Sequence, residues 1–431
     1  MGLDIYPGPF FIGDVSLSEM FLERNASWHH STSLLRWMEA RRKNSYLELL
    51  VEPSMQVIEA SQKELLNDFL SFPRTLYKND PNWVPFSVVE IKDILDPNKN
   101  RFFTHGCCKL WILTDSSKVI GRIAAFINYE KLNSSHPVGG IGFFECINDA
   151  TSAHLLFDTA RDWLMQKQMK AMDGPINFGE NYNYWGLLVE GFKFPSLGMN
   201  YNFPYYQQLF ESYGFVKLYD QYTNLLDATV PMPARFIKIA ERVMNNANYQ
   251  FKHIEKKHFK RFANDLQQIY NDAWSDFENF TPIEIETIIA SFRQMKPLID
   301  EKIIWFAYHN EEPIAFIVCL PDVNQVLRKL HGETFNTWNK LKFLWYNKTL
   351  TIDRLRILVM GCKKKFQNRG IESALIRCLQ LEVLPRKTIK EVELAWVGDF
   401  NSKMMALHEA TGAQKDKVHR TYRYEFDGSQ Y

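Results

Sequence analysis

The chain has 431 residues, which is too long for one small domain and suits two or three folding units. Its 51 Lys and Arg residues balance 50 Asp and Glu residues, and the resulting net charge of +1 argues against a dedicated nucleic-acid-binding protein. Apolar residues make up 46% of the chain, so wholesale disorder is excluded. No apolar run approaches the length of a transmembrane helix, so we expect no membrane-spanning segment and no membrane partner.

The first 54 residues do not share the pattern of the rest. They mix Pro, Gly, Ser, His and aromatic residues and lack the continuous apolar run of a signal peptide. A regular pattern begins at Met55. We therefore predict that residues 1–54 are a poorly structured extension, and we interpret Met55 as the natural start.

Residues 55–228 read as a first α/β unit. A short strand at 56–60 and a helix to about residue 77 lead to a turn-rich passage. A hairpin of two strands at 109–114 and 119–129 is predicted next, followed by a strand at 139–146 and a helix at 153–169. A helix at 206–213 and a strand near 218–225 end the unit.

Residues 229–431 read as a second unit with the same order of elements. After a linker at 229–233 we expect a helix, a strand at 249–254, two helices, a hairpin and a mostly helical insertion. A strand, a helix, a strand, a helix and a final strand should follow. The hairpin is predicted at 303–308 and 313–320, and the insertion at 324–346. One local match supports a tandem duplication: 209–214 and 407–412 both read Leu-x-Glu-x-x-Gly, with the Gly ending a helix.

The stretch from Arg356 to Leu384 is the most informative part of the second unit. An apolar run of strand type at 357–360 is followed by a turn with three lysines and then by an amphipathic helix. The free N–H groups and the dipole at a helix start favour an anion, and Gly370 allows close approach to the backbone. The turn lacks the Gly-Lys-Ser/Thr of a P-loop and the Gly-x-Gly-x-x-Gly of a dinucleotide site.

This turn resembles motif A of the GCN5-related N-acetyltransferases, in which a strand precedes Gln/Arg-x-x-Gly-x-Gly/Ala. The matching residues here are Gln367, Asn368, Arg369, Gly370 and Ile371, and the sequence departs from the family at Glu372. The resemblance implies that this turn, with Lys364 and Lys365, holds the pyrophosphate of acetyl-CoA. It also implies that the end of the strand, at Met360 and Cys362, meets the pantetheine and the acetyl carbonyl, and that Asn401 contacts the cofactor.

The same resemblance implies the fold. Each unit is expected to be a mixed, mostly antiparallel twisted sheet flanked by helices, so that the chain is an α/β (α+β) tandem of acyl-CoA N-acyltransferase units. The first unit lacks the Gln/Arg-x-x-Gly pattern and the lysines, and Asp149 and Thr151 read there as helix-start residues. We therefore interpret it as a degenerate copy and expect only the second unit to bind coenzyme A.

The predicted function is transfer of an acetyl group from acetyl-CoA to an amine of a small molecule or peptide. The family commonly has a Tyr after its last helix as general acid toward the thiolate; Tyr422 and Tyr424 match, and we prefer Tyr422. Glu393 is a candidate base, with a solvated surface carboxylate as the alternative.

Two other classes of function stay open: a non-catalytic acyl-CoA-binding protein, which Glu372 would favour, and a Fem-like aminoacyl transferase. The second should carry more positive charge, since its substrate is an RNA.

Residues 173–206 are rich in Asn and aromatic residues. They read either as an acceptor-binding loop that crosses the second unit or as a long structural loop.

The six cysteines contain no Cys-x-x-Cys pair. We interpret them as reduced core residues of a cytoplasmic protein and expect neither disulfides nor a metal site. They are Cys107, Cys108, Cys146, Cys319, Cys362 and Cys378.

Overall fold

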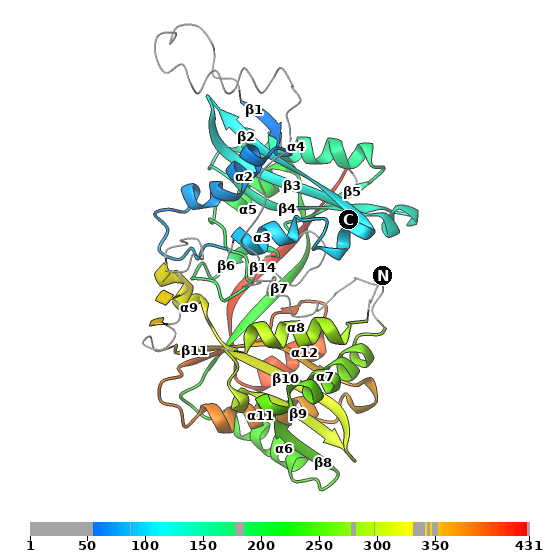
Figure 1. Cartoon of the computed structure of the whole chain (residues 1–431), viewed down its shortest axis with the longest axis vertical. Helices are drawn as coiled ribbons and strands as arrows, with labels where there is room; N and C mark the ends of the chain where they lie inside the picture. The colour runs from blue at the N-terminus through cyan, green and yellow to red at the C-terminus, as the bar shows by residue number, and fades with distance from the viewer. Residues whose placement is uncertain are drawn as a thin grey trace.

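The computed structural model describes residues 55–86, 88–176, 185–276, 282–296, 298–330, 341–342, 345–346 and 352–428. The predicted extension at 1–54 and most of the predicted insertion lie outside these residues. One continuous sheet runs through the molecule in the order β1-β2-β3-β4-β5-β14-β7-β12-β11-β10-β9-β8, with β6 and β13 at its side. Figure 1 shows it extending along the length of the molecule, with helices on its faces.

The first half of the sheet is built from the first half of the chain. Its elements are β1 (Gln56–Glu59), α2 (Lys63–Leu76), α3 (Val88–Ile94), β2 (Gly106–Asp115), β3 (Lys118–Asn128), β4 (Val138–Cys146), α4 (Ala150–Gln166), β5 (Ala171–Gly174), β6 (Leu187–Glu190), α5 (Tyr206–Tyr213) and β7 (Val216–Asp227). The predicted hairpin, the strand before α4 and α4 itself are confirmed.

The second half repeats this order after the helix α6 (Ala234–Met244). Its elements are β8 (Tyr249–His253), α7 (Phe259–Ala273), α8 (Ile285–Met295), β9 (Ile304–His309), β10 (Glu312–Pro321), α9 (Asn324–Leu327), β11 (Arg354–Cys362), α11 (Ile371–Val383), β12 (Glu391–Glu393), β13 (Val397–Gly398), α12 (Ser402–Ala410) and β14 (Gln414–Glu425). The predicted mixed sheets, mostly antiparallel and flanked by helices, are confirmed.

The two halves exchange their last strands. The final strand of the chain, β14, lies beside β5 of the first half, with Tyr422 opposite Gly174. The final strand of the first half, β7, lies beside β12, with Leu226 opposite Val392. In Figure 1 the green β7 and the red β14 run side by side through the middle of the molecule, and the C-terminus lies in the upper half. Chain segments 55–228 and 229–431 therefore do not enclose complete sheets, which corrects the predicted division.

Both faces of the sheet in the second half are covered by helices. Along β10, Ala315, Ile317 and Cys319 pack in a core with α6 and α11. Their neighbours in sequence, Phe316, Val318 and Leu320, pack in a second core with α7 and α8. Alternate strand residues point to opposite faces, so this continuous apolar strand is what a sheet covered on both sides requires. The six cysteines are free, and four of them are buried.

Candidate functional site

The strands β11 and β12 separate partway along their length. They pair in parallel only from Arg354 to Arg356. Beyond that point β12 stays with β7, because the N–H of Leu394 donates to the carbonyl of Asn224 at 2.9 Å and Val397 lies opposite Tyr222. On that side, β11 beyond Arg356 has no strand partner among the described residues.

A bulge in β11 lies next to this opening. Val318 of β10 pairs with Val359 and Cys319 pairs with Ile357, so Leu358 is an extra residue between them. The bulge reverses the alternation of the strand, since Ile357 belongs to the core under α11 and Val359 to the core under α7 and α8. Met360 and Cys362 lie beyond the bulge, opposite Ile317 and Ala315 of β10, and their contact with the pantetheine and the acyl carbonyl stays a prediction. The irregular peptide is at Leu358.

The predicted anion-binding turn follows β11. Asn368 has φ of +60° and Gly370 has φ of +78°, and α11 begins at Ile371 with no side-chain cap. The side chain of Gln367 stays in the turn, because its Nε2 donates to the carbonyl of Cys362 at 3.0 Å. A Cβ at Gly370 would lie 3.1 Å from Val243 of α6. The N-cap residue of α11 is thus a glycine, which has no side chain to bond the first N–H groups of the helix.

The cations of the turn differ in their partners. The backbone N–H of Lys364 donates to Asp272 at 2.8 Å, and its Nζ donates to Ser275 and pairs with Asp276. Lys365 and Arg369 instead lie over the ring of Phe366, at 5.7 and 5.4 Å from its centre. Neither has a carboxylate partner within the described part of the chain. Lys365 and Arg369 are therefore the cations of the turn that could meet a phosphate.

The position of Glu372 is unfavourable for a phosphate site at this turn. It lies in the first turn of α11, close to the thiol of Cys362. Burial raises the pKa of Glu372, while its own backbone N–H and the Cys362 thiol partly offset this. An ionised carboxylate there repels a phosphate, whereas a protonated one does not. The turn therefore fits an anion when Glu372 is neutral or turned away.

A buried carboxylate lies where β11 and β12 separate. Glu393 is fully buried, and Ser196 Oγ donates to its Oε2 at 2.7 Å. Its Oε1 lies 3.3 Å from Arg356 Nε, and its Oε2 lies 3.5 Å from Lys417 Nζ. Burial alone would raise the pKa of Glu393, but Lys417, Arg356 and Ser196 outweigh it and hold the pKa below the usual value. Glu393 is thus ionised and interior, and the surface alternative is wrong.

A second buried carboxylate, Asp322, was not identified from the sequence. Its Oδ1 accepts from the N–H groups of Asn324 and Leu197, at 3.2 and 3.3 Å, while its Oδ2 has no hydrogen bond. Burial first, and the charge of Glu393 second, raise the pKa of Asp322 to about 6. The sequence could not indicate this burial, because Asp322 and Leu197 are 125 residues apart.

The first half of the chain covers these carboxylates with residues 193–197, which we call the strap. Within the strap, Ser196 binds Glu393, Leu197 binds Asp322, and the carbonyl of Pro195 accepts from Asn324 Nδ2 at 2.8 Å. Part of the predicted 173–206 loop therefore does lie across the second half. Residues 177–184 of that loop lie outside the described residues, and its role in binding an acceptor stays a prediction.

The strap is anchored at its other end by charge. Lys193 Nζ lies 2.7 Å from Asp416 Oδ1, and the ring of Phe194 lies 4.6 Å from the guanidinium of Arg354. The site therefore contains groups from both halves.

The structure does not bring Tyr422 to the turn. Strand exchange puts Tyr422 in the core of the first half, where its hydroxyl donates to Glu211 Oε1 at 2.9 Å. The prediction that Tyr422 protonates a leaving thiolate is therefore corrected. Asn401 is exposed and caps α12, its side chain accepting from the N–H of Met404 at 3.1 Å.

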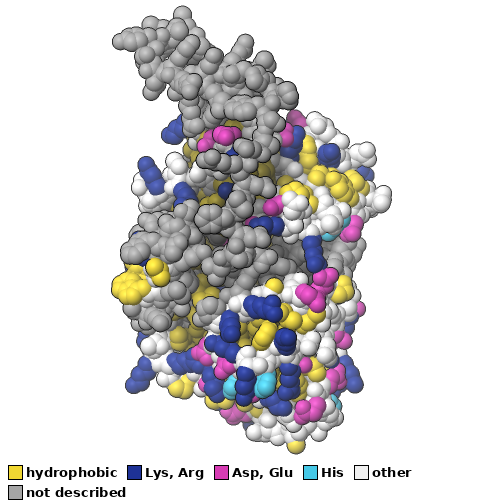
Figure 2. Space-filling model, in the orientation of Figure 1, with side chains coloured by type: hydrophobic (Ala, Val, Ile, Leu, Met, Phe, Trp, Pro, Cys, Tyr) yellow, Lys and Arg dark blue, Asp and Glu magenta, His cyan; other side chains and the backbone are white. Residues whose placement is uncertain are grey.

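The described residues hold no cluster of three or more His, Cys, Asp or Glu side chains suited to a metal ion. In the part of the chain that is described, no helix has the length and apolarity to cross a bilayer. On the face shown in Figure 2, Lys and Arg side chains are interspersed with Asp and Glu, in keeping with the balanced net charge.

No family model matches the chain. It is 28% identical to a protein of Caulobacter vibrioides described as "Bacterial ceramide synthase", over 85% of this chain and 97% of that protein. It is also 28% identical to "Protein YghO" of Escherichia coli, over 84% of this chain and 93% of that protein. Among solved structures, a GCN5-related glucosamine N-acetyltransferase region of a fungal multi-domain β-N-acetylglucosaminidase superposes with a TM-score of 0.50 and 12% identity, over 87% of this chain and 38% of that one. The chain therefore has the fold of the GCN5-related N-acetyltransferase superfamily, in two copies that share one sheet.

Proposed function

We propose that the protein is an N-acyltransferase that moves a fatty acyl group from acyl-CoA to the amine of a long-chain amino alcohol. The observation that carries this is the opening between β11 and β12, with a bulged peptide at Leu358, an open helix start after β11, and two buried carboxylates beside it. The name of the Caulobacter relative supports the substrates, because a ceramide is the amide of a fatty acid and a long-chain amino alcohol. A fatty acyl group thus replaces the acetyl group first expected.

The thioester would bind along the free edge of β11. The N–H groups at the start of α11, with Lys365 and Arg369, would hold the pyrophosphate. The acyl carbonyl would accept a hydrogen bond from the irregular backbone at Leu358, which is the donor that a developing oxyanion requires. This arrangement needs Glu372 protonated or turned away, as described above.

The acceptor amine must lose a proton before it attacks. Glu393 remains ionised and would attract the ammonium group. Asp322, with a pKa of about 6, is better matched to accept the proton near neutral pH. A thiol has a pKa of about 8.5, so the departing thiolate needs little assistance, and no tyrosine is required for it.

The direct test is formation of an amide. Palmitoyl-CoA and sphinganine are incubated with the full chain, and the product is identified by mass spectrometry. We expect N-palmitoylsphinganine from the wild type and a loss of about 100-fold or more in kcat for Glu393→Gln and Asp322→Asn.

Asp265→Asn is the matched control, because Asp265 is a buried carboxylate of the same half that accepts a hydrogen bond from Tyr308. The proposal fails if no amide forms with long-chain amines, or if the two site variants are as active as Asp265→Asn.

One observation favours a second candidate, a protein that binds acyl-CoA without turnover. Glu372 lies at the helix start where the family has Gly or Ala, and its carboxyl is unfavourable for a phosphate. Under this alternative acyl-CoA binds weakly, and no thiol is released with any amine.

A further inference from the structure

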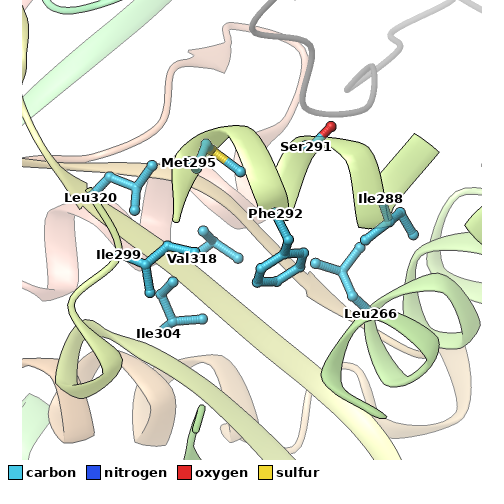
Figure 3. A pocket seen from close by; sticks show the side chains of 9 residues that line it. All are labelled: Leu266, Ile288, Ser291, Phe292, Met295, Ile299, Ile304, Val318 and Leu320. Atoms are coloured by element: carbon cyan, nitrogen blue, oxygen red, sulfur yellow. The ribbon is translucent and has the colours of Figure 1, made fainter. Parts of the chain in front are cut away.

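A small cavity with apolar walls lies on one face of the second half of the sheet. Figure 3 shows it between α8 and the strands β9 and β10. Its volume is about 10 Å³, close to the space that one water molecule needs. The lining residues are Leu266, Ile288, Ser291, Phe292, Met295, Ile299, Ile304, Val318 and Leu320.

The cavity offers a ligand no polar partner. Its lining has one polar side chain, Ser291, whose hydroxyl donates to the carbonyl of Thr287 at 3.0 Å. In Figure 3 this hydroxyl points away from the other lining side chains. Polar ligands need hydrogen bonds when they are buried, so only hydrocarbon suits these walls.

The cavity adjoins the acyl-transfer site through β10. Its lining residue Val318 pairs with Val359, next to the bulge at Leu358. Its lining residue Leu320 pairs with Arg356, whose Nε lies 3.3 Å from Glu393. Leu358 and Val359 both pack toward the core under α7 and α8, the face that holds the cavity. A chain leaving a carbonyl held at the free edge of β11 would therefore reach Val318 and Leu320 by passing over β11, on the face that packs against α7 and α8.

We propose that this cavity receives the methyl end of the acyl chain of the thioester donor. The proposal rests on the proposed function, whose substrate it specifies as a donor with a long, straight hydrocarbon chain. We assign the cavity to the donor because Leu358 and Val359, beside which the acyl carbonyl would lie, pack in the same core as the cavity lining.

Entry of the chain requires the cavity to widen. Ile288, Phe292 and Met295 come from α8, so a shift of this helix or of its side chains enlarges the space. Met295 is unbranched and adapts to new neighbours at little strain. Each methylene that enters should strengthen donor binding by about fourfold, until the chain reaches the end wall.

The test measures kcat/KM for acyl-CoA donors from eight to eighteen carbons, with sphinganine held constant. Phe292→Ala should move the preferred donor to longer chains, and Met295→Phe should move it to shorter ones. Met165→Phe, at an exposed position of α4 in the first half, is the matched control and should leave the profile unchanged. Thermal melts show whether each variant is folded.

A second series varies the chain of the amine with palmitoyl-CoA held constant. If Phe292→Ala and Met295→Phe shift the acceptor profile instead of the donor profile, the assignment to the donor is overturned. An unchanged donor profile in both folded variants overturns it as well.

A binding measurement separates this inference from the proposed function. Fluorescence titration with cis-parinaric acid needs no turnover. Binding by the wild type that is weakened at least tenfold in Met295→Phe and kept in Met165→Phe supports the cavity, even if no amide forms. Equal binding by all three folded proteins contradicts it, even if amide synthesis is observed.

Discussion

The turn between β4 and α4 and the turn between β11 and α11 occupy the same place in the two halves, yet they end differently. In the first, Asp149 caps its own helix by accepting from the N–H of Ser152 at 2.7 Å. In the second, Gly370 takes a positive φ and no side chain caps α11. The start of α4 is thus bonded by a carboxylate at its N-cap, whereas the N-cap of α11 leaves its N–H groups to other partners, such as water or a ligand.

The strand edges show the same contrast. Both β4 and β11 carry a register shift near their middle, next to a short parallel partner. In the first half the chain then fills the edge itself, because the N–H of Ile176 donates to the carbonyl of Ile141 at 2.8 Å. A Cβ at Gly142 would lie only 1.9 Å from the carbonyl oxygen of Ile176. The first half is thus closed at the place where the second half is open.

The largest effect is expected from blocking the open turn. Gly370→Trp should abolish acyl-CoA binding, because a side chain at φ of +78° is strained and would meet Val243. Calorimetry with octanoyl-CoA measures the loss. Thr151→Trp, at an exposed position of the closed turn, should bind like the wild type. Retained binding by folded Gly370→Trp would place the thioester elsewhere.

The next effect concerns pH and Asp322. As a proton acceptor with a pKa of about 6, it should make kcat rise with pH through that region, and Asp322→Asn should remove this limb along with most activity. The free energy of unfolding should depend on pH in the opposite direction. The folded pKa lies above the unfolded value of about 3.9, so the free energy of unfolding should fall as pH rises from about 4 to 6.

Urea unfolding at pH 4, 5, 6 and 7 measures this dependence. Asp322→Asn should flatten it between pH 4 and 6. If the wild type and Asp322→Asn have the same slope over this range, the raised pKa is contradicted.

A smaller effect, on acyl-CoA affinity, is expected from changing Glu372, where the sequence of the open turn departs from the family. Glu372→Gln keeps the shape of the side chain and removes its charge, so acyl-CoA should bind roughly tenfold more tightly at pH 8, where an interaction of about 1.4 kcal/mol is regained. The gain should shrink at lower pH, because Glu372 has a raised pKa and is then protonated in the wild type. Affinity that is equal in both proteins at every pH would show that the carboxyl turns away.

The smallest effect should come from the closed turn. Asp149→Ala removes the cap of α4 and should lower the free energy of unfolding by about 1 kcal/mol. Acyl-CoA affinity should not change, since the first half holds no thioester in this account. Chemical denaturation and calorimetry on the same variant check both statements, and weaker acyl-CoA binding would argue for a role of the first half in holding the donor.

The order of elements and the open turn could be predicted because they depend on local pattern. The apolar strand, the lysines and Gly370 are neighbours in the sequence, and their spacing carries the signal. Strand exchange could not be predicted, because β14 could pair either with β12 of its own half or with β5 of the first half, and the choice rests on contacts across some 250 residues, as at Asp173 and Arg423. This is why Tyr422 was assigned to the wrong half.

The burial of Glu393 and Asp322 could not be predicted from the sequence either. Glu391, Val392 and Glu393 alternate as in a half-exposed strand, and only the strap from the first half makes Glu393 an interior group. Asp322 was missed for the same reason, since its contact with Leu197 joins residues far apart in the sequence.

The central claim is that one half of the molecule is open to an acyl thioester and the other is closed. The stoichiometry of octanoyl-CoA binding to the wild-type chain, measured by calorimetry, tests it most directly. The account predicts one site per chain, lost in Gly370→Trp and kept in Thr151→Trp. Two sites per chain, or none in a folded protein, would contradict it.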